Sequence, residues 1–291
     1  AFVWSVCCTV DKFGRKALDE FVRRECASNG FRYPFPEKGT IYDYVWDGSS
    51  NKWVEWSETV EPYQHNPKLS FSELIIPTTD TIKYTHIMNM LIERSMHVLV
   101  CGPTGTGKSV NINTYLQKMD KKFVPIAFTF SAQTSENMTQ DIIDGKCEKR
   151  RKGVFGPMAG KKFVVFVDDV NMPQREIFGA QPPIELLRQL LCASGWYDRK
   201  TLKWRSIIDT IVINACGPPG GGRNPVTPRY FRHFNVLCYT AMSAQVMSQI
   251  FTTILDGHLA QCEDEVAGLT DFLTRGCINL YDSILNALLP T

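Results

Sequence analysis

The sequence predicts an α/β fold, in which a central parallel sheet of five strands is flanked by helices. Apolar runs of strand length recur along the chain without alternation of polar and apolar residues, which indicates strands buried on both faces. Segments with helical periodicity separate these runs, so strands and helices alternate as they do in parallel sheets. A glycine-rich turn also joins the first of these strands to the helix that follows it.

The elements follow in order along the chain. We expect strands at residues 97–101, 124–130, 163–167, 210–216 and 234–239, and helices at residues 108–119 and 184–192. The tail, residues 241–289, has helical spacing and no strand signals, which predicts a smaller helical part. Pro62 and Pro67 mark a linker before the sheet region. The predicted divisions are residues 1–73, 74–240 and 241–291.

The segment before this linker predicts a helix and a β-hairpin. Residues 10–27 mix apolar and charged side chains at helical spacing. Extended segments around Trp46 and Trp53 then flank a turn-forming stretch at residues 47–51. Together with Trp56, these side chains can form a ligand platform. Aromatic pairs across two strands commonly hold a hairpin together, and we favour that interpretation.

The composition predicts a globular chain and excludes several classes of protein. With 291 residues, 44% of them apolar, the chain is long enough to bury a core. The formal net charge of +2 gives no overall field for nucleic acid or an anionic membrane. No stretch approaches the roughly 20 apolar residues of a membrane span. Ten scattered cysteines without a Cys-x-x-Cys pair indicate a reducing compartment and no cysteine-bound metal.

Residues 102–109 read Gly-Pro-Thr-Gly-Thr-Gly-Lys-Ser and match the P-loop pattern between a strand and a helix. Glycines let backbone N–H groups turn toward phosphate oxygens, and the positive end of the following helix adds to the attraction. Lys108 is placed to neutralise the β- and γ-phosphates, and the Ser109 hydroxyl to bind magnesium. We expect ATP or ADP with Mg²⁺ to contact Gly102, Pro103, Thr104, Gly105, Thr106, Gly107, Lys108, Ser109 and Val110.

Paired carboxylates follow the third predicted strand. In P-loop proteins an acid at the end of a neighbouring strand completes the magnesium site, and Asp168 has that position. Asp169 would then polarise the attacking water. The alternative is that the pair shapes the turn or caps the next helix. The P-loop upstream favours the chemical interpretation.

Two further segments carry candidate phosphate contacts. Residues 217–224, Gly-Pro-Pro-Gly-Gly-Gly-Arg-Asn, follow the fourth strand, and we expect them to form a loop close to the γ-phosphate. Arg229 or Arg232 can reach the nucleotide of a neighbouring subunit, the alternative being a surface salt bridge. The basic run at residues 148–152 is either a phosphate patch or a solvated loop. We favour the loop, because no aromatic residues interleave with the charges.

Taken together, four motifs resemble one family. They are the P-loop, Phe166-Val-Asp-Asp-Val-Asn-Met-Pro173, Gly179-Ala-Gln-Pro-Pro-Ile-Glu-Leu-Leu-Arg188 and Gly217-Pro-Pro-Gly-Gly-Gly-Arg-Asn224. The chain resembles the third AAA+ module of an axonemal dynein heavy chain over essentially its whole length. Residues 1 to about 70 resemble the end of the preceding module. Because the first residue is not a methionine, we expect a piece of a longer polypeptide.

The resemblance implies an AAA+ P-loop sheet domain followed by the start of a helical lid, set in a ring of six modules. It implies a regulatory ATPase within a ciliary motor that moves toward microtubule minus ends. The implied partners are the neighbouring modules, the microtubule through a coiled-coil stalk outside this chain, and dynein intermediate and light chains. The implied location is the cytoplasm, the cytoskeleton and the ciliary axoneme. Neither nucleic acid nor a membrane is an expected partner.

The resemblance also assigns roles to single residues. Ile76, Pro77 and Thr78 resemble the segment that touches adenine. The family usually has glutamate where this chain has Asp169, which implies slow turnover. The polar sensor after the fourth strand falls at or near Gly217, with Asn214 as a substitute. The sequence ends at Thr291, where the family continues into a lid with a second sensor arginine.

Two functions therefore remain open. In the first, the chain hydrolyses ATP, with Lys108 on the phosphates, magnesium on Ser109 and Asp168, and Asp169 orienting the water. In the second, it holds ATP or ADP as an allosteric ligand and hardly turns over. A nucleic-acid-remodelling ATPase is a third reading, which the near-neutral charge disfavours.

Overall fold

A computed structural model describes residues 2–63, 74–260 and 262–288. Its contacts divide the chain into two units. The P-loop unit comprises residues 1–18 and 85–240, and the helical unit comprises residues 19–84 and 241–291.

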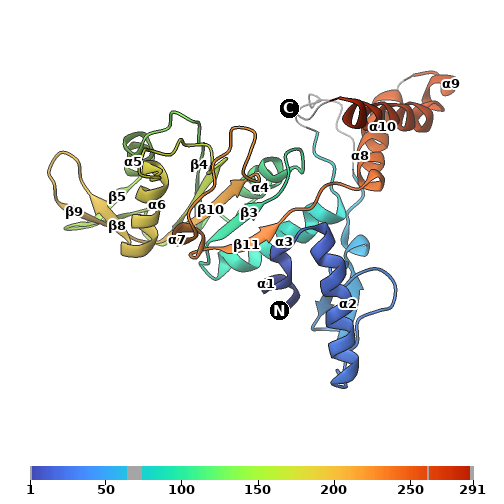
Figure 1. Ribbon diagram of the computed structural model, residues 1–291, viewed down its shortest axis with the longest axis horizontal. Helices are drawn as coiled ribbons and strands as arrows, with labels where there is room; N and C mark the ends of the chain where they lie inside the picture. The colour runs from blue at the N-terminus through green and yellow to red at the C-terminus, as the bar shows by residue number, and fades with distance from the viewer. Residues whose placement is uncertain (1, 64–73, 261, 289–291) are drawn as a thin grey trace. The chain divides into compact units, whose positions relative to one another are not determined.

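The P-loop unit is built on a parallel sheet of five strands (Figure 1). The strands lie in the order β11 (Asn235–Cys238), β3 (Val98–Cys101), β10 (Thr210–Cys216), β7 (Lys162–Asp168) and β4 (Phe123–Thr129). The helices of this unit include α1 (Phe2–Ser5), α4 (Lys108–Gln117), α5 (Glu136–Asp144), α6 (Pro182–Ala193) and α7 (Pro228–Phe231), with a 3₁₀ turn η1 (Cys7–Thr9). The predicted five-stranded parallel sheet with flanking helices is confirmed.

Both faces of the sheet are buried, as the continuous apolar runs predict. On one face the side chains of Val165, Val167 and Val212 pack with Leu187 and Leu190 of α6. The alternate residues of the same strands point to the other face and are buried too; they include Val98, Val100, Val164, Phe166, Ile211 and Ile213. A strand covered on both faces has no need of polar alternation.

The N-terminal residues cover one edge of this sheet. The Cys8 thiol donates to the carbonyl of Val236 at 3.1 Å, and the Arg15 guanidinium donates to the carbonyl of Cys238 at 2.6 Å. Both carbonyls belong to the edge strand β11. Edge strands present unpaired backbone groups. These two contacts therefore cover carbonyl groups on the edge strand β11.

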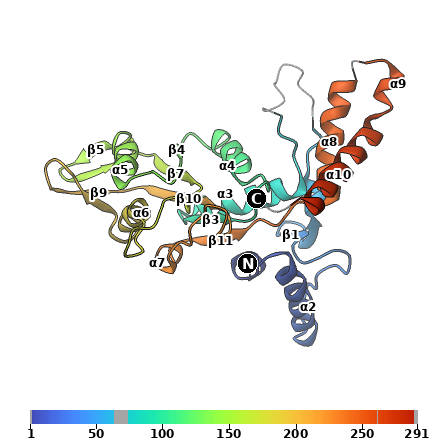
Figure 2. The same ribbon diagram turned by 45° about the horizontal axis from the view of Figure 1, so that its top comes forward.

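A second sheet of four short strands corrects one prediction. It has the order β5 (Glu148–Arg151), β6 (Val154–Gly156), β9 (Trp204–Ile207) and β8 (Gly195–Tyr197). Both views place these strands on the side of the unit away from α4 (Figures 1 and 2). The basic run at residues 148–152 is thus mostly a strand, not a loop, although its side chains are largely exposed. Hydrogen bonding to β6 holds these polar residues extended.

The helical unit contains the predicted hairpin. Its strands are β1 (Tyr44–Asp47) and β2 (Lys52–Glu55), followed by a 3₁₀ turn η2 (Trp56–Thr59). Trp46 lies opposite Trp53 in the register, and their rings meet edge to face with centroids 5.1 Å apart. The tryptophans therefore hold the hairpin together, as the preferred interpretation requires. The remaining helices, two of which begin or end in the other unit, are α2 (Lys12–Ser28), α3 (Thr79–Glu93), α8 (Ala244–Leu259), α9 (Asp264–Ala267) and α10 (Thr270–Ala287).

In the part of the chain that the structure describes, no helix is both long enough and apolar enough to span a bilayer.

Candidate functional site

Three neighbouring strands end side by side and bring the candidate residues to one edge of the sheet. In the register, Cys216 of β10 pairs with Cys101 of β3, and Asn214 pairs with Val167 of β7. The P-loop follows β3, the paired aspartates close β7, and the glycine-rich loop follows β10. Ligands in open α/β sheets bind at the carboxyl ends of the strands, so this edge is the expected site.

The P-loop forms a tight turn between β3 and α4. Gly102 begins it, and a Cβ atom there would lie 2.4 Å from the Tyr239 carbonyl oxygen, so only glycine fits. Gly105 and Gly107 have φ angles of 79° and 73°, which favour glycine. Among the described residues, the N–H groups of Gly105, Thr106 and Gly107 have no hydrogen-bond acceptor. They are free to donate to an anion at the start of α4.

The Lys108 ammonium group lies within this turn. Its Nζ donates to the carbonyl oxygens of Gly102 at 2.9 Å and Pro103 at 2.6 Å. Burial lowers the pKa of Lys108, and the positive charge of Arg223 lowers it further, while Asp168 and Asp169 oppose the shift. These influences place the lysine within electrostatic range of both aspartates. A phosphate would replace weak carbonyl partners with a full negative charge.

Ser109 and Asp168 form a donor set that suits magnesium. The Ser109 hydroxyl has no hydrogen-bond partner among the described residues, and the Asp168 carboxylate accepts only the N–H of Asp169, at 3.0 Å. Within the same part of the chain Asp168 forms no ion pair. A hydroxyl and a carboxylate are the hard oxygen ligands that Mg²⁺ binds beside nucleotide phosphates. The residues present therefore fit the ion.

Asp169 lies in an unusual backbone conformation and meets an arginine. Its φ angle is 49°, in the left-handed region that few residues other than glycine adopt. The Arg223 Nη2 atom lies 3.4 Å from its Oδ1 atom. A Cβ atom on Gly217 would lie 2.8 Å from Arg223 Nε. The glycine at the expected sensor position thus leaves the space through which Arg223 reaches Asp169.

Sequence reasoning missed Arg223 as an individual site residue. The loop was expected near the γ-phosphate because of its glycines, but no role was given to its only cation. The Nε atom of Arg223 is buried and has no hydrogen-bond partner within the described chain. The sequence did contain a signal for Arg223. Gly217 lacks a side chain at the strand end where the family usually has a polar sensor.

Asn214 is buried below this edge, on the core side of β10. Its Nδ2 atom donates to the Tyr230 hydroxyl at 2.7 Å, and its side chain is fully buried. Burial raises the pKa of Tyr230, so the phenol stays protonated. The expected role of Asn214 as a sensor remains a prediction. The geometry places Arg223, and not Asn214, against Asp169.

The two candidate arginine fingers lie at α7. Both Arg229 and Arg232 are exposed, and within the described ranges neither forms an ion pair. The Nε atom of Arg232 has one contact, to His233 Nε2 at 3.5 Å. The surface salt bridge weighed as the alternative is therefore not formed with any residue that the structure describes. Their action on a neighbour stays a prediction.

The expected adenine segment lies in the helical unit. There the Thr78 hydroxyl and backbone bond to Thr81 and close a turn before α3. Contact of Ile76, Pro77 and Thr78 with adenine remains a prediction.

Comparison with known proteins identifies the family. A family model described as the P-loop containing dynein motor region matches residues 63–242. The chain belongs to the dynein motor region family. Residues 1–58 of this dynein chain match a second model, the dynein heavy chain AAA lid domain. The predicted resemblance to axonemal dynein heavy chains is thereby confirmed at the level of the family.

Curated relatives match this dynein chain over its entire length. It is 39% identical to dynein axonemal heavy chain 1 of Homo sapiens, 40% to dynein axonemal heavy chain 12 of Mus musculus and 38% to dynein axonemal heavy chain 6 of Homo sapiens. The aligned part makes up 8%, 10% and 7% of these relatives, respectively. The chain therefore spans a tenth or less of the length of the relatives it matches.

The buried pair of Asn214 and Tyr230 gives a stability prediction. Tyr230→Phe leaves the Asn214 amide buried without its acceptor, which should lower the free energy of unfolding by about 1–3 kcal/mol. Urea unfolding followed by circular dichroism measures the change. Tyr197→Phe is the matched control, because that ring is exposed and its hydroxyl has no partner in the described chain. It should change stability by less than about 0.5 kcal/mol. Equal losses in both variants would contradict the role of the pair.

Proposed function

We propose that the chain is an ATP-binding, slowly hydrolysing regulatory module of an axonemal dynein heavy chain. The observation that carries the proposal is the convergence of Lys108, Asp168 and Asp169 at the ends of two strands separated only by β10. The P-loop holds the phosphates through its free N–H groups and the Lys108 ammonium. This arrangement supports nucleotide binding.

Each residue of the site has a separate role in magnesium binding or hydrolysis. Ser109 and Asp168 would hold Mg²⁺, which when bound draws negative charge from the β- and γ-phosphates. Asp169 orients the attacking water and accepts its proton through Oδ1 or Oδ2. Arg223 leaves Asp169 when a γ-phosphate is present and stabilises the charge that develops there.

Slow turnover is part of the proposal. Asp169 is one methylene shorter than the glutamate expected by family resemblance, and Arg223, which lies 3.4 Å from its carboxylate, must leave Asp169 before the water can be oriented. The same contact favours the second candidate function, in which the module binds nucleotide as an allosteric ligand with little or no hydrolysis. In both cases nucleotide binding comes first.

We further propose the position of the chain in the motor. Residues 1–73 would be the end of a second module and its connection, residues 74–240 the large subdomain of the third, and residues 241–291 the start of its lid. The match of residues 1–58 to a dynein lid model supports the first assignment. From the family resemblance we further propose minus-end-directed motility, microtubule binding through a stalk, dynein intermediate and light chains as partners, and location in the cytoplasm and ciliary axoneme. The names of the relatives, axonemal dynein heavy chains, are consistent with these proposals.

Nucleotide binding is tested by Lys108→Ala. Loss of the charge-assisted contacts to phosphate should weaken binding of a fluorescent ATP analogue with Mg²⁺ by about 10- to 100-fold. Lys118→Ala removes an exposed lysine at the other end of α4 and should leave affinity unchanged. Equal affinity of the Lys108→Ala chain and the wild type would refute a phosphate site at the P-loop.

Hydrolysis is tested in the complete heavy chain by single turnover. Asp169→Asn keeps the size of the side chain but removes the base, so the rate at this site should fall by about 100-fold. The Lys108→Ala heavy chain, which should not fill this site, is run alongside for comparison. Arg223→Gln should slow the same step by about tenfold. Unchanged rates in Asp169→Asn would leave the allosteric module as the function.

The arginines of α7 are tested in the same heavy chain. Because both are exposed and form no ion pair in the described chain, Arg229→Ala and Arg232→Ala should leave nucleotide affinity at the Lys108 site within about twofold. Turnover in the adjoining module should fall in the variant that removes the finger. A collapse of affinity at the Lys108 site would instead assign these residues to the fold or the local pocket.

A further inference from the structure

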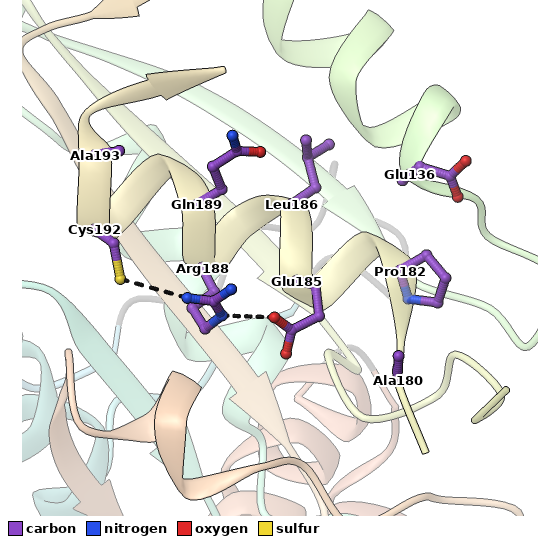
Figure 3. A pocket seen from close by; sticks show the side chains of 9 residues that line it. All are labelled: Glu136, Ala180, Pro182, Glu185, Leu186, Arg188, Gln189, Cys192 and Ala193. Atoms are coloured by element: carbon purple, nitrogen blue, oxygen red, sulfur yellow. Dashed lines mark hydrogen bonds and ion pairs between the residues drawn. The ribbon is translucent and has the colours of Figure 1, made fainter. Parts of the chain in front are cut away.

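A cysteine and a histidine meet on the surface of the P-loop unit, outside the phosphate site. The Cys192 Sγ atom lies 3.2 Å from His233 Nε2. Arg188 Nη1 lies 3.8 Å from the same sulfur, and Arg232 Nε lies 3.5 Å from the same ring nitrogen. The cysteine and Arg188 belong to α6, while the other two residues follow α7. Figure 3 shows Cys192 and Arg188 on one side of α6, joined by a dashed line.

The contacts of His233 Nε2 fit the tautomer that carries its proton on Nδ1. A guanidinium group only donates hydrogen bonds, so the contact with Arg232 makes His233 Nε2 an acceptor. The Cys192 thiol is then the donor in the contact between sulfur and nitrogen. Burial lowers the pKa of His233, and the charges of Arg232 and Arg188 lower it further. The imidazole is therefore neutral at pH 7 and ready to accept the thiol proton.

Two guanidinium groups lie close to this pair, one at each atom: Arg188 Nη1 at the sulfur and Arg232 Nε at the imidazole. Among the described residues, Arg188 is also paired with the Glu185 carboxylate at 2.6 Å, and Arg232 is paired with no carboxylate. The thiolate is the nucleophilic form of cysteine, so a base beside the thiol is what its reaction requires.

The thiol is also accessible. Cys192 is exposed and lines an open hollow of about 630 Å³ along α6, together with Glu185, Arg188 and Gln189. This volume lies within the usual range of small-molecule sites. None of the residues that line the hollow belongs to the phosphate site.

We propose that Cys192 is a site of reversible thiol modification, with His233 as its base and anionic low-molecular-weight disulfides such as glutathione disulfide as its substrates. His233 Nε2 takes the proton from Cys192, and the thiolate attacks one sulfur of the disulfide. The sulfur–sulfur bond of glutathione disulfide breaks, and one glutathione leaves as a thiolate that takes the proton back. The products are a mixed disulfide on Cys192 and one reduced glutathione, so no further oxidant is needed.

The two guanidinium groups at the thiol and imidazole pair are the basis for choosing an anionic substrate, and the carboxylates of Glu136 and Glu185 line the same hollow. Glutathione carries carboxylates, which complement the guanidinium groups of Arg188 and Arg232. An adduct on Cys192 stands next to Arg232, one of the two candidate trans-acting arginines. An effect of the adduct on Arg232 as a trans-acting arginine rests on the proposed function, whereas the modification of Cys192 itself does not.

The test uses the reduced 291-residue chain with glutathione disulfide at pH 7. Mass spectrometry of peptides follows adduct formation at each cysteine over time. Cys262 and Cys277 are matched internal controls, because both are exposed and neither thiol has a partner in the described chain. Cys192 should react about tenfold faster than either. Equal rates at Cys192 and Cys277 would overturn the proposal without any variant being made.

Two variants test the assigned roles. His233→Asn keeps a polar side chain but removes the base, and it should bring the rate at Cys192 to within about twofold of that at Cys277. Arg188→Gln should abolish the preference of Cys192 for glutathione disulfide over the cationic disulfide cystamine. Circular dichroism confirms that each variant is folded. A rate at Cys192 that is unchanged by His233→Asn would also overturn the proposal. The readout is independent of ATP, so its failure leaves the proposed nucleotide function standing.

Discussion

The parallel alignment of β3, β10 and β7 is the constraint on which the rest of the site depends. Because the strands are parallel and in register, their carboxyl ends reach one edge together. β10 lies between the other two, so the P-loop and the paired aspartates approach the same space from its two sides. Each of these strands is buried on both faces, so close packing on both sides holds it in register. The hydrophobic core therefore fixes the position of the P-loop relative to the paired aspartates.

The sequence was sufficient for this part of the fold because its signals are physical and local. Strands buried on both faces, such as β7 and β10, need continuous apolar residues, and that pattern is visible without a structure. The P-loop glycines were visible for the same reason, since a tight turn requires them. The second sheet was not predicted. Its strands are three or four residues long, and β5 consists of charged residues whose extended backbone pairs with β6.

Arg223 shows where residue patterns stop being informative. Its contact with Asp169 joins residues 54 positions apart in the chain and depends on the absence of a side chain at Gly217. No periodicity reports such a contact. The left-handed backbone of Asp169 is equally hidden, and such conformations persist where the surrounding structure imposes them. The same contact gives the Asp169 carboxylate a partly buried cationic partner, Arg223.

Asn214 supplies a physical link between this edge and the surface that carries the candidate arginine fingers. It lies on β10, two residues before the strand ends, and its amide is bonded to the buried hydroxyl of Tyr230. Tyr230 is the anchor of α7, and Arg229 and Arg232 flank it in the sequence. This hydrogen bond is fully enclosed and costly to break. It therefore ties the short helix α7 to the strand that ends at the phosphate site.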